Sequence, residues 1–354
     1  MKSTFGKNIT VEIFGGSHEE IIGVTIKNFP ISLPEIDMAK LQAFLDKRAP
    51  GNSPFATVRK EPDKAELHSE DPLTFIIKNI DAKPSDYKTM SAIPRPGHAD
   101  YTAFVRYGKS VNMAGGGPFS ARMTAPLCIA GGIALQYLEK RGIRIGAHIL
   151  SVDDICEKSF DPFNPQIDEI QSEFPVINRV VGDLMRERIL NVAKEKDSLG
   201  GVVEVAAVGL PPGIGGAMYD GLESLLAPIF FGIPAVKGVE FGNGFESSKM
   251  KGSENNDAFE IKDGKIVTKT NNAGGILGGI TTGMPILLKI AFKPTPSIPK
   301  EQDSVNLDKM ENCKLKIKGR HDPCVAFRAI PVTMAATALG ILDALVGQEN
   351  TRLR

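Results

Sequence analysis

The sequence predicts an α+β fold on three observations. The chain has 354 residues, of which 42% are hydrophobic, which is enough for a large buried core. Segments with strand and helix patterns do not alternate in a strict βαβ series, which argues against a doubly wound parallel sheet. A faint repeat relates Ser17–Leu33 to Ser198–Ile214 at a constant offset (17 to 198, 29 to 210). Each copy predicts a strand, a proline turn and a helix, as an internal duplication would, and a chance match is the alternative.

Helices are expected where apolar residues recur every three or four positions, as Met38, Leu41 and Leu45 do. The expected helices are 37–45, 124–141, 178–195, 220–227 and 333–346. The expected strands are 8–14, 23–28, 143–150, 202–209 and 286–292. The polar stretches 157–172 and 246–272 carry Pro, Asn and Gly and predict surface excursions.

Composition excludes several classes of protein. The 42 basic and 42 acidic residues give no net charge, which argues against a nucleic-acid partner. The four cysteines form no CxxC pair, and the N-terminus lacks an apolar signal core. The apolar run 225–236 contains two prolines and is shorter than the roughly 20 residues that span a bilayer. We therefore expect a cytoplasmic protein with reduced thiols and no membrane association.

Three motif-like segments fail on inspection. Gly108-Lys109-Ser110 resembles the end of a P-loop, but Ala103 stands where that loop needs Gly. Gly213-Ile214-Gly215 is followed by Met218 where a dinucleotide fingerprint needs its third Gly. His321, Asp322 and Cys324 are too crowded for a standard zinc pattern. We expect no metal.

The histidines are the most informative residues. The chain has five, and three of them lie in Ser17-His18, Arg95–Asp100 and Arg320–Cys324, beside turn-forming residues, acids or arginines. An imidazole titrates near neutral pH and commonly moves protons in catalysis. These segments predict one site that is assembled from distant loops.

Glycine-rich and cationic segments point to anionic ligands. Gly115–Arg122 is a glycine run before a helical pattern, which suits an anion or, alternatively, a turn with an N-cap. Asn271–Gly283 would let a flat or anionic ligand lie against backbone, and Lys293–Ser297 would hold a phosphate, although ordinary turns explain both. The basic residues of Asp46–Ser53 and Arg59–Asp63 suit carboxylate or phosphate, or a solvated surface.

Taken together, these segments resemble the chorismate synthases over nearly the whole chain. The matching segments are Phe14–His18, Arg95–Asp100, Ser120–Arg122, Ala235–Glu240, Asn271–Gly283, Lys293–Ser297 and Gly319–Cys324. The resemblance implies one catalytic domain over residues 1–354, with helices sandwiched between antiparallel β-sheets, usually in a homotetramer.

The implied activity is that of a lyase. It is the 1,4-elimination of phosphate from 5-enolpyruvylshikimate 3-phosphate to give chorismate, the last common step of the shikimate pathway to aromatic amino acids. The reaction needs reduced FMN but has no net redox change. The missing dinucleotide fingerprint favours a separate flavin reductase, although the sequence leaves open whether the chain reduces its own flavin with NADPH.

The resemblance also implies roles for residues. His18 would protonate the departing phosphate, His98 would serve the reduced flavin, and Asp322 would assist proton removal at a flavin nitrogen. Substrate contacts carry over to Ser17, Arg48, Arg59 and Arg122, because arginine holds carboxylate and phosphate bidentately. Flavin contacts carry over to Phe119, Ser120, Ala235, Gly278, Lys293, Pro294, Thr295, Pro296, Ser297 and Arg320.

The chain departs from the family pattern at several positions. Pro118 and Pro54 stand at commonly basic positions, Glu19 replaces a Gly, and Gly16 and Met123 replace Glu. We expect weaker ligand binding or compensation by nearby lysines, namely Lys47 or Lys60. Two other hypotheses remain. The chain is a non-catalytic protein that binds flavin or a phosphorylated metabolite, or it is an unrelated phosphotransferase that uses the glycine loops.

Overall fold

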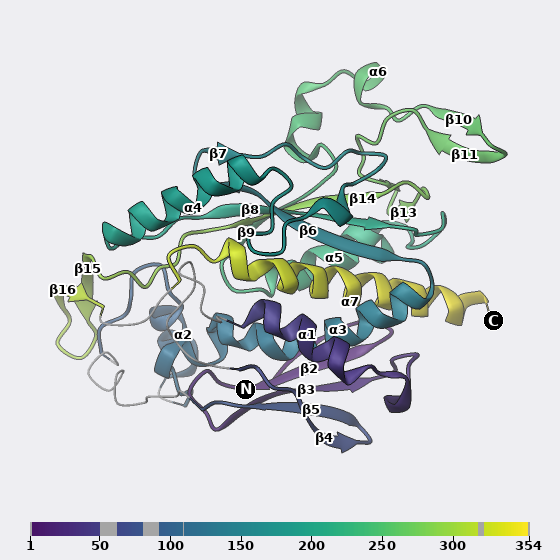
Figure 1. Cartoon of the computed structure of the whole chain (residues 1–354). Coiled ribbons are helices and arrows are strands. Elements are labelled where there is room, and N and C mark those ends of the chain that lie inside the picture. The colour runs from purple at the N-terminus through teal and green to yellow at the C-terminus, as the bar shows by residue number, and fades with distance from the viewer. Residues whose placement is uncertain (1, 50–61, 81–91, 109, 318–321, 353–354) are drawn as a thin grey trace.

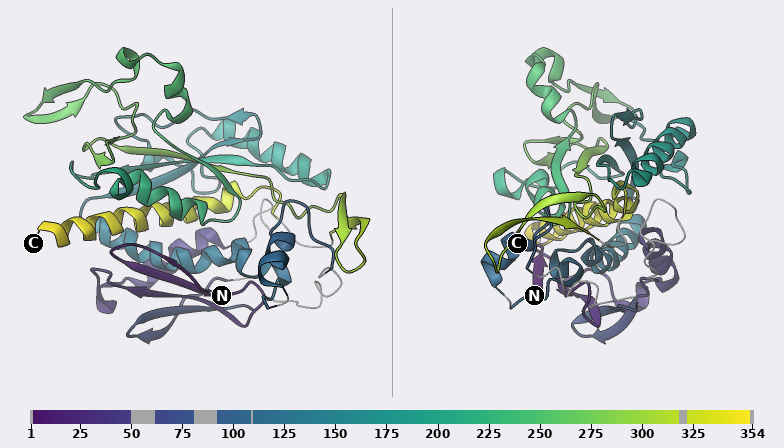
Figure 2. Two further views of the ribbon diagram at one scale, coloured as in Figure 1. Left: turned by 180° about the vertical axis from the view of Figure 1, so that it is seen from behind. Right: turned by 90° about the vertical axis from the view of Figure 1, so that its left-hand side faces the viewer.

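A layer of helices lies between two five-stranded antiparallel sheets in the computed structural model (Figure 1). The structure describes residues 2–49, 62–80, 92–108, 110–317 and 322–352. The two further views in Figure 2 show the same three layers, with the sheets on opposite sides of the helices. The predicted α+β sandwich is therefore confirmed.

The first sheet has β3 at its centre. Its order is β1 (Lys2–Phe5), β2 (Thr10–Gly15), β3 (Ile21–Lys27), β5 (Leu73–Lys78) and β4 (Glu66–Glu70), and all neighbours are antiparallel. Ile22, Val24 and Ile26 are at most 2% exposed. Since alternate residues of a strand share a face, these three side chains point at the helical layer.

The second sheet has β8 at its centre. Its order is β7 (Ile155–Cys156), β6 (Arg144–Val152), β8 (Gly201–Val208), β14 (Ile286–Phe292) and β9 (Val236–Phe241), again antiparallel. Val203 and Val205 join the main core, whereas Ala206 belongs to a smaller outer cluster with Phe160 and Leu287. Three short hairpins complete the strands: β10 (Phe259–Lys262) with β11 (Lys265–Thr268), β12 (Ile276–Leu277) with β13 (Ile280–Thr281), and β15 (Glu301–Asn306) with β16 (Glu311–Lys316).

Four helices fill the space between the sheets: α1 (Met38–Arg48), α3 (Thr124–Lys140), α5 (Leu222–Phe231) and α7 (Ala326–Arg352) (Figure 1). Helix α4 (Arg179–Lys194) lies on the other side of the second sheet, and α2 (Asp100–Tyr107) lies at one end of the molecule. The short helices are α6 (Gly252–Asn255), η1 (Leu33–Glu35), η3 (Ala114–Phe119), η4 (Ala121–Met123), η5 (Ile167–Glu169), η6 (Met218–Asp220) and η7 (Gly244–Lys249).

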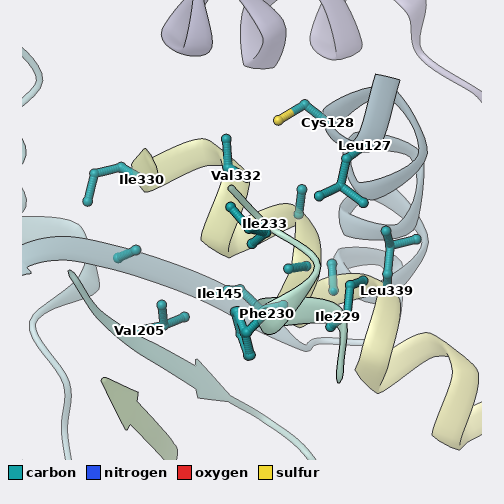
Figure 3. Packing of buried hydrophobic residues seen from close by; sticks show 14 of the residues in the cluster. Leu127, Cys128, Ile145, Val205, Ile229, Phe230, Ile233, Ile330, Val332 and Leu339 are labelled. Atoms are coloured by element: carbon teal, nitrogen blue, oxygen red, sulfur yellow. The ribbon is translucent and has the colours of Figure 1, made fainter. Parts of the chain in front are cut away.

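Helix α7 is the centre of the core. Figure 3 shows its Val332 and Leu339 in the same buried cluster as Leu127 of α3 and Phe230 of α5. Ala326–Glu349 is long and apolar enough to cross a membrane, but 94% of its most apolar window is buried inside the protein. Burial between two sheets explains that hydropathy, because a helix enclosed by protein is apolar all round.

The faint sequence repeat corresponds to equivalent structural elements. The offset between its copies maps the central strand β3 onto β8, which is also central, and α1 onto the region of α5. In each half an edge strand and an inner strand follow, β4 and β5 or β9 and β14, and then one long core helix, α3 or α7. The shared order of elements supports an internal duplication.

Candidate active site

The two histidines that the sequence predicts to be catalytic lie against a run of three glycines. Gly115, Gly116 and Gly117 have φ values of 61°, 96° and 51°, a region that side chains rarely adopt. A Cβ on Gly115 would lie 2.0 Å from Cε1 of His18, and a Cβ on Gly116 would lie 3.0 Å from Nε2 of His98. The imidazoles therefore rest on consecutive residues of one backbone segment.

His18 is positioned by the turn between β2 and β3. The preceding Ser17 is 1% exposed, and its N–H donates to the carbonyl of Gly117 at 3.3 Å. The N–H of Glu19 donates to the carbonyl of Gly16 at 3.0 Å, which closes the turn. This strand turn is thereby joined directly to the glycine run.

The same turn accounts for one departure from the family pattern. Glu19 is exposed, and its Oε1 lies 2.9 Å from the position of a Cβ on Gly16. The carboxylate of residue 19 thus fills the space that a side chain at residue 16 would need. Glu19 therefore places a carboxylate beside residue 16, the position where the resemblance led us to expect a Glu.

His98 is held by an ion pair from its own segment. Its Nδ1 lies 2.8 Å from Oδ1 of Asp100, and Arg95 donates to both oxygens of Asp100, from Nε and Nη2, each at 2.7 Å. Partial burial opposes ionisation of Asp100, but the hydrogen bonds from Arg95 and His98 outweigh it and hold the pKa of this carboxyl well below its usual range.

The loop that the sequence predicts to grip phosphate lies beside His98. Arg95 Nη1 donates to Oγ of Ser297 at 3.3 Å, and Nζ of Lys293 donates to the carbonyl of Gly97. A Cβ on Gly97 would lie 3.3 Å from Cβ of Pro296. The Arg95–Asp100 turn and the Lys293–Ser297 loop therefore form one unit.

The other predicted flavin contacts extend this unit on both sides. The carbonyl of Ala235 accepts the N–H of Lys293 at 2.9 Å, and Pro294 follows directly. The carbonyl of Thr295 accepts from Ser198, whereas its Oγ1 is buried and has no hydrogen-bond partner among the described residues. At the end of the glycine run, Phe119 precedes Ser120, whose Oγ accepts the N–H of Arg122 at 3.3 Å.

Two of the predicted substrate arginines share one buried carboxylate. Asp63 is fully buried, and its Oδ2 lies 2.6 Å from Nη1 of Arg48 while Oδ1 pairs with Nη1 of Arg122. Arg48 is 2% exposed and also donates to Thr124 and the carbonyl of Ala121. Both arginines therefore help to hold the fold together, and the charge of Asp63 offsets half of their combined charge.

Asp322 joins the same region through Arg328, the third residue of α7. Nη1 of Arg328 donates to the carboxylate of Asp322 at 2.9 and 3.2 Å, and its Nε donates to the carbonyl of Arg48 at 3.1 Å. The third predicted catalytic residue is thus tied to the end of α1. Arg59 and Arg320 lie outside the described residues.

Gly278 is the exception among the predicted site residues. It lies in the β12–β13 turn, which packs on Gly215 and Gly221, near the residues that precede β14. Lys293 follows the opposite end of β14, and seven residues of strand span about 23 Å. Within one chain, Gly278 is therefore not brought together with the others.

A cavity of about 270 Å³ opens on the second sheet, on the face that carries Glu204 and Lys289. It is also lined by Phe160, Asn243 and Asn271 and contains none of the predicted catalytic or ligand residues. The acid–base groups therefore do not point to this cavity as the reaction site.

Sequence analysis assigned no role to Asp63 or Asp100. The spacing of Asp100 from His98 was a usable signal, because His98 lies two residues before Asp100, which starts α2. Asp63 gave no such signal, since it lies 15 and 59 residues from the arginines that it joins.

Comparison with known proteins identifies the family of this chain. A family model described as chorismate synthase matches residues 9–346. The chorismate synthase of Lancefieldella parvula is 42% identical, over 98% of this chain and 96% of its own. That of Thermococcus kodakarensis is 40% identical, over 96% and 97%. A crystal structure of chorismate synthase shares the fold with a TM-score of 0.75 at 24% identity, covering 97% of this chain and 93% of the other. This chain belongs to the chorismate synthase family.

Proposed function

We propose that this chain is a lyase that eliminates phosphate from 5-enolpyruvylshikimate 3-phosphate to give chorismate, with reduced FMN as cofactor and no net redox change. One observation carries the proposal: His18 and His98 rest on adjacent glycines, beside the Lys293–Ser297 loop. Remote loops thereby supply proton donors and anion contacts to one place.

The residues around His98 fit a phosphorylated flavin. Lys293 offers a cation, Ser297 a hydroxyl, and Thr295 a buried Oγ1 without a hydrogen-bond partner among the described residues. A buried hydroxyl normally finds a partner, so a ligand contact would complete this one. Together with Ala235, Phe119 and Ser120, these residues would hold FMN, which supplies electron density to the substrate when it is bound and reduced.

The chain itself would supply protons and electrostatic stabilisation. His18 would donate a proton to the departing phosphate, and His98 would hold a proton at the cofactor side. Asp322, fixed by Arg328, would accept the proton that the substrate loses. Arg48 and Arg122 with Asp63 carry one net positive charge, which would attract the anionic substrate.

The assembly proposed for this chain is a homotetramer in the cytoplasm, with a separate protein reducing the flavin. One face of the β10–β11 hairpin carries Phe259, Ile261 and Ile266, which are 64%, 80% and 71% exposed. A two-stranded hairpin is marginal in water by itself, so a second copy of the chain is the partner we assign to this face. A second copy would also let Gly278 approach a flavin site from outside the chain.

Anaerobic incubation with reduced FMN and the substrate tests the proposal. We expect stoichiometric release of phosphate, and a rate that falls by roughly 10²–10⁴ in His98→Ala. Repeating the assay with NADPH in place of a chemical reductant shows whether the chain reduces its own flavin. Tight FMN binding without phosphate release at high enzyme loading would instead support a non-catalytic flavin-binding protein.

A further inference from the structure

The ion pair between Arg95 and Asp100, beside His98, makes more hydrogen bonds than are needed to close a turn. Asp100 receives hydrogen bonds on both oxygens: Oδ1 from His98 Nδ1 and Arg95 Nη2, Oδ2 from Arg95 Nε and the Arg95 backbone N–H at 3.0 Å. Such a bidentate arginine–carboxylate pair is strong, and it fixes the orientation of the guanidinium plane and of the carboxylate plane. Arg95 is 6% exposed, so solvent competes little for these bonds.

The contacts at Nδ1 define the tautomer of His98. Asp100 stays ionised because its pKa is held low, so its oxygens only accept hydrogen bonds. The other neighbour of Nδ1 is Nη2 of Arg95 at 3.2 Å, which only donates. This donor would suit a lone pair on Nδ1, but it is the more distant neighbour and already donates to Oδ1 of Asp100 at 2.7 Å. A lone pair on Nδ1 would face the negative carboxylate at 2.8 Å, so the closer contact favours hydrogen on Nδ1, and in the neutral ring Nε2 holds the lone pair.

The other ring nitrogen points to the glycine run. A Cβ on Gly116 would lie 3.0 Å from Nε2 and 3.2 Å from Cε1 of His98, and Gly116 has none. The side chain of His98 is 14% exposed, so the ring is not fully enclosed by the protein. With hydrogen on Nδ1, the ring atom left to exchange a proton is Nε2, on the side of Gly116 and Ser120.

We propose that Asp100 and Arg95 are positioning residues that lock His98 with its hydrogen on Nδ1, so that Nε2 is the atom that exchanges protons during the elimination. This inference rests on the proposed function for its kinetic consequence, but the tautomer is a property of the protein alone. Arg95 also donates to Oγ of Ser297, which links the His98 segment to the proposed cofactor-binding loop.

The variant Asp100→Asn tests the positioning role. Asparagine keeps the shape, but its amide can offer either an acceptor or a donor to Nδ1, so the ring is free to populate the other tautomer. We expect phosphate release to fall by roughly 10²–10⁴ with little change in KM, as for other misoriented catalytic histidines. Asp153→Asn is the matched control, because Asp153 pairs with Arg188 at 2.7 Å without a histidine.

Two readouts separate positioning from mere stabilisation of the turn. In a His98→Ala background, Asp100→Asn should cause no further loss of turnover. An equal loss in both backgrounds would overturn the proposal. In ¹⁵N-histidine-labelled protein, with His98→Ala to assign the signal, neutral His98 should show hydrogen on Nδ1, and Asp100→Asn should shift it to a mixture. Hydrogen on Nε2 in the unaltered protein would equally overturn it, and since no substrate is needed, this result stands even if no phosphate is released.

Discussion

At the scale of single residues, the site depends as much on missing side chains as on present ones. The sequence made the glycine run and the histidine segments recognisable, and contacts link the two histidines to that run. It could not show that Arg48 and Arg122 share Asp63, because a buried carboxylate pairs with whatever the fold brings to it. Charge and spacing alone suggested two open cations, whereas both guanidiniums are at least 94% buried.

Gly115→Ala should damage the site without unfolding the protein. Its Cβ would lie 2.0 Å from the ring of His18, so the imidazole must move. We expect the rate of phosphate release to fall at least tenfold. Gly142→Ala is the control, because Gly142 also has a positive φ, of 78°, but nothing lies within 4 Å of the added Cβ. Both variants pay a backbone cost of about 1 kcal/mol, so equal rates would show that the contact with His18 does not matter.

Asp63→Ala should lower stability strongly. It leaves two buried guanidiniums without their shared carboxylate, and breaking a buried ion pair costs about 3–5 kcal/mol. Urea denaturation measures the free energy of unfolding. The control is Asp303→Ala, which removes a carboxylate that is 87% exposed and should cost at most about 1 kcal/mol. Similar losses in the two variants would contradict the structural role of Asp63.

At the scale of elements, periodic and buried segments were predictable and the others were not. The strand expected at 286–292 has those bounds, and helices α3 and α4 each lie within one residue of expectation. Helix α7 was expected from 333 but begins at Ala326, because the helix continues through Pro331, its sixth residue. Helix α2 was missed, since it is only eight residues long and buries only Ala103.

The second sheet contains a buried charged cluster that makes stability depend on pH. His148 lies 2.8 Å from Glu157 through Nδ1 and 2.8 Å from Glu204 through Nε2. Burial would lower the pKa of His148, but the hydrogen bonds and charges of the two glutamates outweigh it and raise that pKa. The folded protein therefore binds this proton more tightly than the unfolded chain does.

This cluster predicts a loss of stability toward alkaline pH. Its contribution is complete below the unfolded pKa of about 6.5 and disappears as the pH rises through the higher folded pKa. The free energy of unfolding should fall as the pH rises from 5.5 to 9, and Glu204→Gln should make this dependence on pH weaker. His68→Gln, at an exposed position of β4, should leave it unchanged. A flat curve for the unaltered protein would contradict the assignment.

At the scale of the whole molecule, the two halves meet along α3 and α7. A Cβ on Gly131 would lie 2.2 Å from Cβ of Ala335, so the helices touch through their backbones. The loops that carry the proposed site come from both halves and gather at one end, whereas Gly278 lies beyond the far end of β14. A sequence shows which loops carry chemistry, but not which end of the sandwich each loop reaches.

Ile261→Lys should weaken assembly if the exposed face of the β10–β11 hairpin binds a second copy. A buried lysine would oppose association, so we expect light scattering to give a smaller mass at micromolar concentration. Glu260→Lys, on the opposite face of the hairpin, should keep the mass of the unaltered protein. Equal masses for all three proteins would show that this face is not the interface.

The most direct test of the account is the position of the ligands in a crystal structure with oxidised FMN and 5-enolpyruvylshikimate 3-phosphate. We predict that both molecules lie against Gly115–Gly117, within contact of His18 and His98, with the flavin phosphate on the Lys293–Ser297 loop. Binding in the cavity beside Glu204 and Lys289, or at any place that contacts neither imidazole, would contradict it.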